Sequence, residues 1–186
     1  MRRRLFITTG LMLAGFGRRA WASLLPAARA QTIRYSPLVR PVTIPLENVN
    51  TLWRPVNFKA EATGAAEAGA TGRRVLISGA LFRRAPAVEG RPGTLDDLSA
   101  LCLTCPHEQC VVDLITDPAQ LVKMTGSAEH HPLFECGCHL SLFDARRDGE
   151  RIAGETARGL FRFRISAVRD GNVEIGEIEE EALSQV

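Results

Sequence analysis

The chain has 186 residues, a length that fits about one domain and excludes an assembly of several large cores. Apolar residues make up 45% and charged residues 24% of the chain, which excludes a disordered chain or a polytopic membrane protein. Residues 1–30 hold six arginines and no acidic residue, so the remaining 17 basic side chains are outnumbered by 21 acidic ones. This acidic body removes the compositional support for a nucleic-acid partner, and none is expected.

Residues 1–30 have the pattern of an export signal. Arginines at positions 2–4 precede a run of low charge over residues 5–17, and small residues at 28–30 have the spacing of a cleavage site. Arg3-Arg4 with the Leu-Phe-Ile that follows resembles a twin-arginine signal, with an ordinary secretory signal as the alternative. The apolar run of roughly 13 residues is shorter than the roughly 20 that span a bilayer. A retained membrane anchor is therefore the less favoured alternative to cleavage.

Residues 31–186 are accordingly expected on the periplasmic side of the bacterial inner membrane, exported by the twin-arginine route and either anchored or soluble. Disulfides persist in that compartment.

The first half of the body is predicted to be extended. Within residues 31–60, Pro37, Pro41, Pro45 and Pro55 exclude a long helix and predict edge segments of a sheet. An alanine- and glycine-rich loop is predicted over residues 61–72. Two short strands, 75–77 and 80–82, are predicted to be separated by a turn at Ser78-Gly79.

The second half of the body also indicates strands. A strand is predicted over residues 98–103, and residues 160–165 alternate apolar and basic side chains with the period of a half-buried strand. Asp170-Gly171-Asn172 predicts a hairpin turn into residues 173–175. The acidic residues within 177–181 are interpreted as a solvated end. The sequence therefore predicts an all-β, mainly antiparallel fold.

Two boxes carry the chemistry, Cys105-Pro106-His107-Glu108-Gln109-Cys110 and Cys136-Gly137-Cys138-His139-Leu140-Ser141. Each box holds two cysteines and one histidine. Four of these six side chains can bind a pair of irons, two cysteines on one iron and two histidines on the other, as in a Rieske centre. The two remaining cysteines can bridge the two boxes.

Two other interpretations of the cysteines stay open. Cys102, Cys105, Cys136 and Cys138 could form a four-thiolate zinc site, which would leave both box histidines unexplained. The cysteines could also serve only to form disulfides in a secreted binding module. Cys102 by itself is interpreted as a small buried hydrophobic residue.

The two boxes resemble those of Rieske iron-sulfur proteins of the quinol:cytochrome c oxidoreductase type, over roughly residues 98–165. The resemblance implies a 2Fe–2S cluster with Cys105 and Cys136 on one iron and His107 and His139 on the other. It also implies a disulfide between Cys110 and Cys138. The implied fold is an antiparallel β domain over residues 31–186 with a smaller cluster-binding subdomain at about 98–158.

The resemblance also assigns residues that tune the cluster. Ser141 matches a family serine that donates a hydrogen bond to a cluster sulfur. Phe143 stands where many high-potential members have tyrosine, so a midpoint potential below the upper end of the family range is expected.

Several positions depart from the family pattern. Glu108-Gln109 replaces a common Leu-Gly pair and could place a charge at the docking tip, while Gly137 replaces proline and Leu140 replaces glycine. Residues 111–135 are longer than the compact versions, which predicts an insertion around 118–132. Gly154-Glu155-Thr156-Ala157 replaces a proline-rich loop that covers the cluster in many relatives.

The expected function is one-electron transport by a subunit of an oxidoreductase, rather than catalysis by this chain alone. The first context is the iron-sulfur subunit of a quinol:cytochrome c oxidoreductase, with cytochrome b and a c-type cytochrome as partners and His139 meeting the quinol. The His-Leu-Ser-x-Phe-Asp run from His139 and the proline-poor loop are also similar to the small Rieske subunit of arsenite oxidase. That alternative implies a molybdopterin catalytic subunit as partner. A zinc-bound or disulfide-stabilised binding module is the non-redox alternative.

Overall fold

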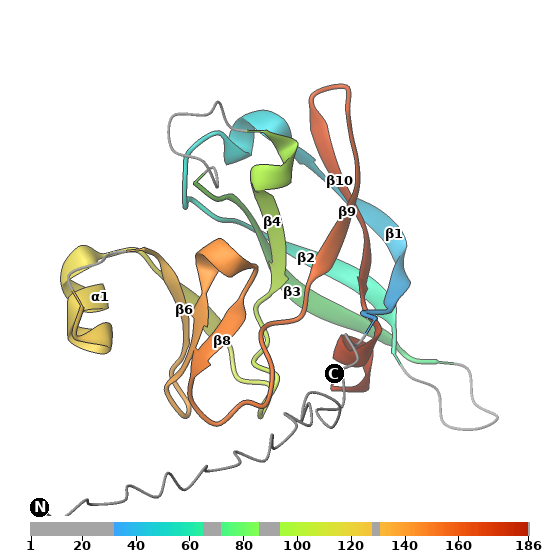
Figure 1. Ribbon diagram of the computed structural model, residues 1–186. Coiled ribbons are helices and arrows are strands. Elements are labelled where there is room, and N and C mark those ends of the chain that lie inside the picture. Colours follow the sequence, from blue (N-terminus) through green and yellow to red (C-terminus); the bar gives the residue numbers. More distant parts are fainter. Residues whose placement is uncertain (1–31, 65–71, 86–93, 128–130, 186) are drawn as a thin grey trace, which may run out of the picture. The chain divides into compact units, whose positions relative to one another are not determined.

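The computed structural model describes residues 32–64, 72–85, 94–127 and 131–185, which form two antiparallel sheets, one short α-helix and four 3₁₀ helices (Figure 1). The expected mainly antiparallel β fold is confirmed. The strands of the larger sheet are β1 (Tyr35–Pro45), β2 (Val56–Thr63), β3 (Arg74–Arg83), β4 (Leu98–Cys102), β9 (Phe163–Arg169) and β10 (Asn172–Glu179). The smaller sheet contains β5 (Val112–Ile115), β6 (Leu133–Cys136), β7 (Ser141–Asp144) and β8 (Glu150–Ala153). The helices are α1 (Pro118–Thr125), η1 (Leu46–Val49), η2 (Leu95–Asp97), η3 (Ala145–Arg147) and η4 (Glu180–Ser184).

The predicted export signal over residues 1–30 lies outside the described residues. Within the described part of the chain, no helix has the length and apolar character needed to cross a membrane.

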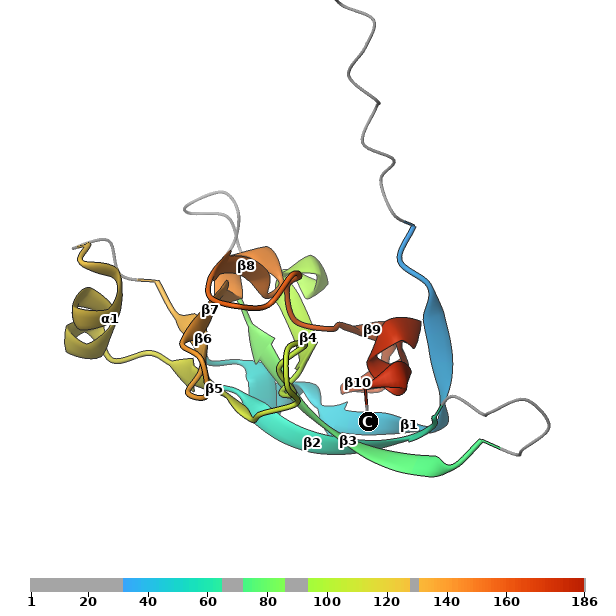
Figure 2. The same cartoon turned by 90° about the horizontal axis from the view of Figure 1, so that it is seen from below.

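The larger sheet has the strand order β4–β3–β2–β1–β10–β9 and encloses the main hydrophobic core. An antiparallel bridge between Leu101 and Arg162 joins its two edges, and the sheet is strongly curved (Figure 2). It is therefore nearly closed into a barrel. Alternate residues of β2, Phe58, Ala60 and Ala62, are buried, as the two-residue period of a strand requires.

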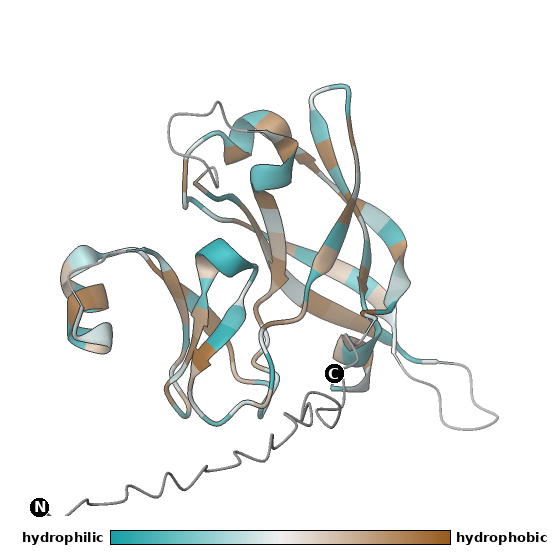
Figure 3. Cartoon of the chain, viewed as in Figure 1, coloured by the Kyte–Doolittle hydropathy of each residue, from teal (hydrophilic) through white to brown (hydrophobic). Residues whose placement is uncertain are grey.

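Strand β4 is buried along its whole length, and its one polar residue, Ser99, donates a hydrogen bond of 2.7 Å to Asp148. Leu98, Ala100 and Cys102 pack into the main core, whereas Leu101 packs into a second core shared with the smaller sheet. Hydrophobic residues are likewise concentrated along the neighbouring β3 (Figure 3). The two cores on opposite sides explain why both faces of β4 are buried.

The predicted turn at Ser78-Gly79 is wrong, because β3 is one continuous strand through both residues. Gly79 pairs with Phe58 on β2 and with Cys102 on β4. A Cβ atom on Gly79 would lie 2.4 Å from Cζ of Phe58 and 2.7 Å from Cε2 of Phe163. The glycine admits these two aromatic rings, whose centroids are 5.0 Å apart, instead of turning the chain.

The prediction that the proline-rich first segment forms sheet edges is also wrong. β1 lies inside the larger sheet, between β2 and β10. Its register with β10 shifts between Pro37 and Val42, and it pairs with β2 at Leu38 and Ala62. An interrupted ladder of this kind accommodates prolines, which lack the N–H that a regular ladder uses.

The predicted hairpin is confirmed. β9 and β10 pair in antiparallel register on either side of Asp170 and Gly171, whose φ angles are 50° and 72°. Positive φ at both central residues is the geometry of a tight turn that matches the strand twist. The strand predicted over residues 160–165 begins later, at Phe163.

The segment between the two boxes contains a helix that the sequence interpretation did not specify. The Asp117 carboxylate caps α1 by accepting a hydrogen bond of 2.8 Å from the backbone N–H of Gln120. Pro118 occupies the first turn, and Gly126 ends the helix with φ of 67°. These are the usual start and stop residues of a helix.

Candidate metal centre

The two boxes lie at the same end of the smaller sheet. The first is a tight turn between β4 and β5, in which Cys105 N–H donates to the carbonyl of Cys110 at 2.8 Å. The second joins β6 to β7, so Cys136 is paired directly with Ser141. Val112, the first residue of β5, is paired with Cys136. Strand register therefore brings the two boxes together.

The thiols of Cys105 and Cys136 form the inner part of the site. Both residues are 1% exposed and pack with Phe134, Phe143 and Leu160 in the second core. Burial raises the pKa of the Cys105 thiol, and the neighbouring Cys136 raises it further. The thiol is therefore protonated at neutral pH, and a metal must displace its proton on binding.

The imidazoles of His107 and His139 form the outer part of the site. Both side chains are exposed, and their ring centroids are 4.9 Å apart at an angle of 77°. One ligand atom from each histidine and from Glu108 lie within 4.8 Å of one another. The structure thus pairs the two imidazoles on the exposed side and the two thiols on the buried side of the same two turns.

A disulfide links Cys110 of the first box to Cys138 of the second, as the resemblance implied. Because Cys138 is bonded to Cys110, it has no free thiolate for a metal. The zinc site built from Cys102, Cys105, Cys136 and Cys138 is therefore wrong. Cys102 is buried in the main core among apolar residues, as the interpretation of a small hydrophobic residue required. The disulfide leaves the predicted ligand cysteines, Cys105 and Cys136, as free thiols.

The hydroxyl of Ser141 tests whether these residues fit an iron-sulfur group. Its Oγ is buried and has no hydrogen-bond partner among the described residues. A buried hydroxyl without a partner is costly, whereas a sulfur of a bound cluster would accept its hydrogen bond. Phe143, also fully buried, contributes no such donor. Two thiols, two imidazoles and a buried donor without a partner fit a 2Fe–2S group.

Two turn residues adopt left-handed backbone angles. Gln109 has φ of 61° and Leu140 has φ of 54°. These are two of the positions at which the resemblance leads us to expect glycine. A side chain at such an angle clashes with the backbone, so both turns carry a conformational cost.

One predicted feature of the C-terminal end is wrong. Glu179 is not solvated but 2% exposed, and it pairs with Arg158 and Arg162. Sequence reasoning missed this ion pair because Arg158 is 21 residues away and no local pattern joins the two.

No protein-family model matches this sequence, and no curated protein matches it. Its proposed function therefore rests on the two boxes and on their geometry.

Proposed function

We propose that this protein is a Rieske-type carrier of single electrons, in which Cys105, Cys136, His107 and His139 hold a 2Fe–2S cluster. The observation that supports this most directly is the layered donor set, with two buried thiols behind two exposed imidazoles. When bound, such a cluster supplies one-electron exchange at a potential within about −150 to +300 mV.

The chain's own residues have distinct tasks in this proposal. The second core excludes water from the sulfur side of the site, since Phe134 and Phe143 pack around both thiols. The exposed histidines let a partner approach the site at its outer edge. The Cys110–Cys138 disulfide holds the two turns together, because each of them is irregular and short.

The proposed context is the iron-sulfur subunit of a quinol:cytochrome c oxidoreductase on the periplasmic side. Cytochrome b and a c-type cytochrome would be its partners. The exposure of His139 supports this context, because an accessible imidazole can exchange a hydrogen bond and a proton with a quinol hydroxyl.

A second context is the small subunit of a molybdenum oxidoreductase resembling arsenite oxidase, with a molybdopterin subunit as partner. The observation that favours it is Glu108, whose carboxylate Oε2 lies 3.9 Å from Nδ1 of His139. A carboxylate is costly to bury against an apolar quinone, whereas a polar protein surface can pair with it.

The test of the cluster is spectroscopic. The full chain is reconstituted with iron and sulfide and then reduced, and we expect a rhombic spin signal with an average g value below that of the free electron. Cys105→Ser and His139→Ala should abolish this signal. Cys102→Ala and His131→Ala are the matched controls, because Cys102 lies in the other core and His131 lies 3.6 Å from Asp144.

The proposal fails if the reconstituted chain stays colourless, if it takes up zinc without iron, or if the signal survives His139→Ala. The two contexts are separated by mixing oxidised protein with a soluble quinol. A quinol donor is supported if the quinol reduces the protein rapidly and Glu108→Leu makes this reduction faster. The molybdenum context is supported if the quinol does not reduce the protein.

A further inference from the structure

The segment that connects β8 to β9, residues 154–161, is named here the strap. It leaves the smaller sheet at Gly154 and enters the larger sheet beyond Phe161. Its backbone is tied to both sheets, since Leu160 N–H donates to the Gly149 carbonyl and Cys102 N–H donates to the Phe161 carbonyl.

At its first end the strap lies against Ser141. Gly154 has φ of 99°, and a Cβ atom there would lie 2.3 Å from Cα and 2.4 Å from Oγ of Ser141. No other residue type could bring the backbone so close. The strap therefore covers the Ser141 hydroxyl, and this explains why that hydroxyl is buried beside Cys136 on the paired strand.

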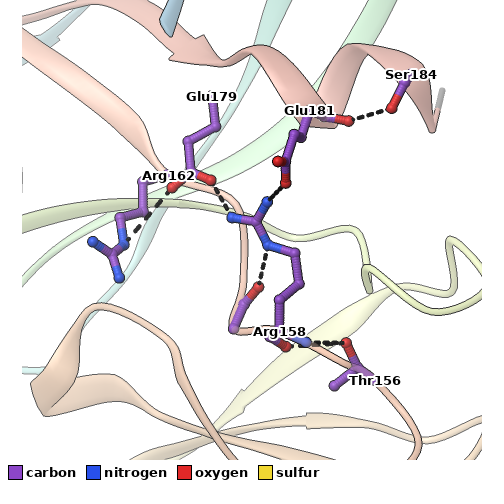
Figure 4. A network of polar contacts seen from close by, with 7 residues as sticks. Thr156, Arg158, Arg162, Glu179, Glu181 and Ser184 are labelled. Atoms are coloured by element: carbon purple, nitrogen blue, oxygen red, sulfur yellow. Dashed lines mark hydrogen bonds and ion pairs between the residues drawn. The ribbon is translucent and has the colours of Figure 1, made fainter. Parts of the chain in front are cut away.

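At its second end the strap is held by Arg158 (Figure 4). The two terminal nitrogens of the guanidinium donate to Glu179 and to Glu181, and Nε donates to the Gly159 carbonyl at 3.2 Å. The guanidinium carbon also lies 4.2 Å from the ring centroid of Phe161. A lysine could not make this set of contacts, because it lacks the planar fork of donors.

Thr156 closes a turn with Arg158 in the middle of the strap. It is buried, and its hydroxyl donates to the Arg158 carbonyl at 3.0 Å while accepting from the Arg158 N–H. The turn from Thr156 to Arg158 is therefore closed by its own hydrogen bonds. Glu155 alone separates this turn from Gly154, so Arg158 acts on Gly154 through a short stretch of backbone.

We infer that Arg158 is a positioning residue for the cluster site. Its ion pairs with Glu179 and Glu181 hold the strap against Ser141, and the strap keeps water from the Ser141 hydroxyl. This inference rests on the proposed function. A hydroxyl that is shielded from water can give its hydrogen bond to a cluster sulfur, whereas a hydrated one divides it with the solvent.

The first experiment uses the cluster-free chain and amide hydrogen exchange. Removing Arg158 alone would leave the buried Glu179 carboxylate with only the longer contact of 3.8 Å to Nε of Arg162. The main variant is therefore Arg158→Gln combined with Glu179→Gln. We expect exchange in the strap to become about ten-fold faster. Arg164→Gln with Glu177→Gln is the matched control, because Arg164 pairs with Glu177 and lies over the Tyr35 ring at 4.0 Å. The control should leave the strap unchanged.

The second experiment measures the midpoint potential of the loaded protein. The Arg158→Gln/Glu179→Gln variant should lower the midpoint potential, and Ser141→Ala should lower it too. In a Ser141→Ala background the same pair of substitutions should have no further effect, because the hydroxyl through which they act is gone. If the substitutions shifted the midpoint potential only by destabilising the fold, the shift would persist in the Ser141→Ala background.

Unchanged strap exchange in the Arg158→Gln/Glu179→Gln variant overturns the inference. So does a potential shift of equal size with and without the Ser141 hydroxyl. If the wild-type chain assembles no cluster, the proposed function fails and the cluster role fails with it. The exchange experiment then still decides whether Arg158 holds the strap.

Discussion

The Cys110–Cys138 disulfide provides a quantitative test of how the two cluster turns are stabilised. The bridge joins residues separated by 28 positions. Loop-closure entropy for a loop of that length corresponds to about 3.5 kcal/mol at 25 °C. We therefore expect Cys110→Ala combined with Cys138→Ala to lower the free energy of unfolding by about that amount. Side-chain burial adds little, because Cys110 is half-buried and Cys138 is exposed.

The assay is equilibrium urea unfolding of the cluster-free chain, since a bound cluster would add its own stabilisation. The dependence on urea should steepen in the variant, because an unfolded chain without the cross-link exposes more surface. Cys110→Ala and Cys138→Ala alone should each match the double variant within about 0.5 kcal/mol, because either one breaks the same bridge. Wild-type protein treated with a reductant should match them too.

The reasoning would be refuted by a double variant, or a reduced wild-type protein, as stable as the oxidised wild type within about 0.5 kcal/mol. Such a result would mean that the two turns remain together in the unfolded ensemble without the bridge, so that closing the loop has no entropic effect.

Three further predictions concern stability. Gly79→Ala should destabilise the cluster-free chain by about 1 to 3 kcal/mol in urea unfolding, because the new methyl would clash with Phe58 and Phe163; a neutral effect would show that the rings move aside freely. Leu140→Gly should stabilise it by up to about 1 kcal/mol, because Leu140 is exposed and its φ is positive; any loss of stability would contradict the strain. Burial raises the pKa of Tyr35 above its ordinary value of 10.0, and the charge of Glu179 adds to this. The folded state therefore favours the neutral Tyr35 phenol. The contribution of Tyr35 to stability is full below pH 10.0 and is lost as the pH rises through its folded-state pKa. Tyr35→Phe should flatten this loss in unfolding measured across that range, and an unchanged pH profile would assign it to another group.

Local sequence patterns were sufficient for several parts of the structure. The turn at Asp170-Gly171 and the strand predicted over residues 98–103 follow from short-range preferences, because backbone angles and strand propensity are set within a few residues. The candidate ligands could also be named directly, since two matching boxes of cysteine and histidine are chemically unusual. Their meeting in space follows from antiparallel pairing of β5, β6 and β7.

Other features depended on contacts between distant residues. Gly79 was predicted to form a turn because glycine is common in turns. Its actual role is set by the rings of Phe58 and Phe163, which a side chain at this position would meet. Glu179 was predicted to be solvated because it stands in an acidic run, yet Arg158 neutralises it in the interior. Neither partner is close in the sequence, so no local pattern could reveal them.

The sequence by itself thus identified the candidate metal ligands and indicated that the chain is built from antiparallel strands. Only the tertiary structure decided that the Ser141 hydroxyl is buried and that Arg158 pairs with Glu179 and Glu181. The physical reason is that ligand chemistry and strand periodicity are properties of short segments. Burial, close packing and ion pairing arise between segments that meet only after the chain has folded.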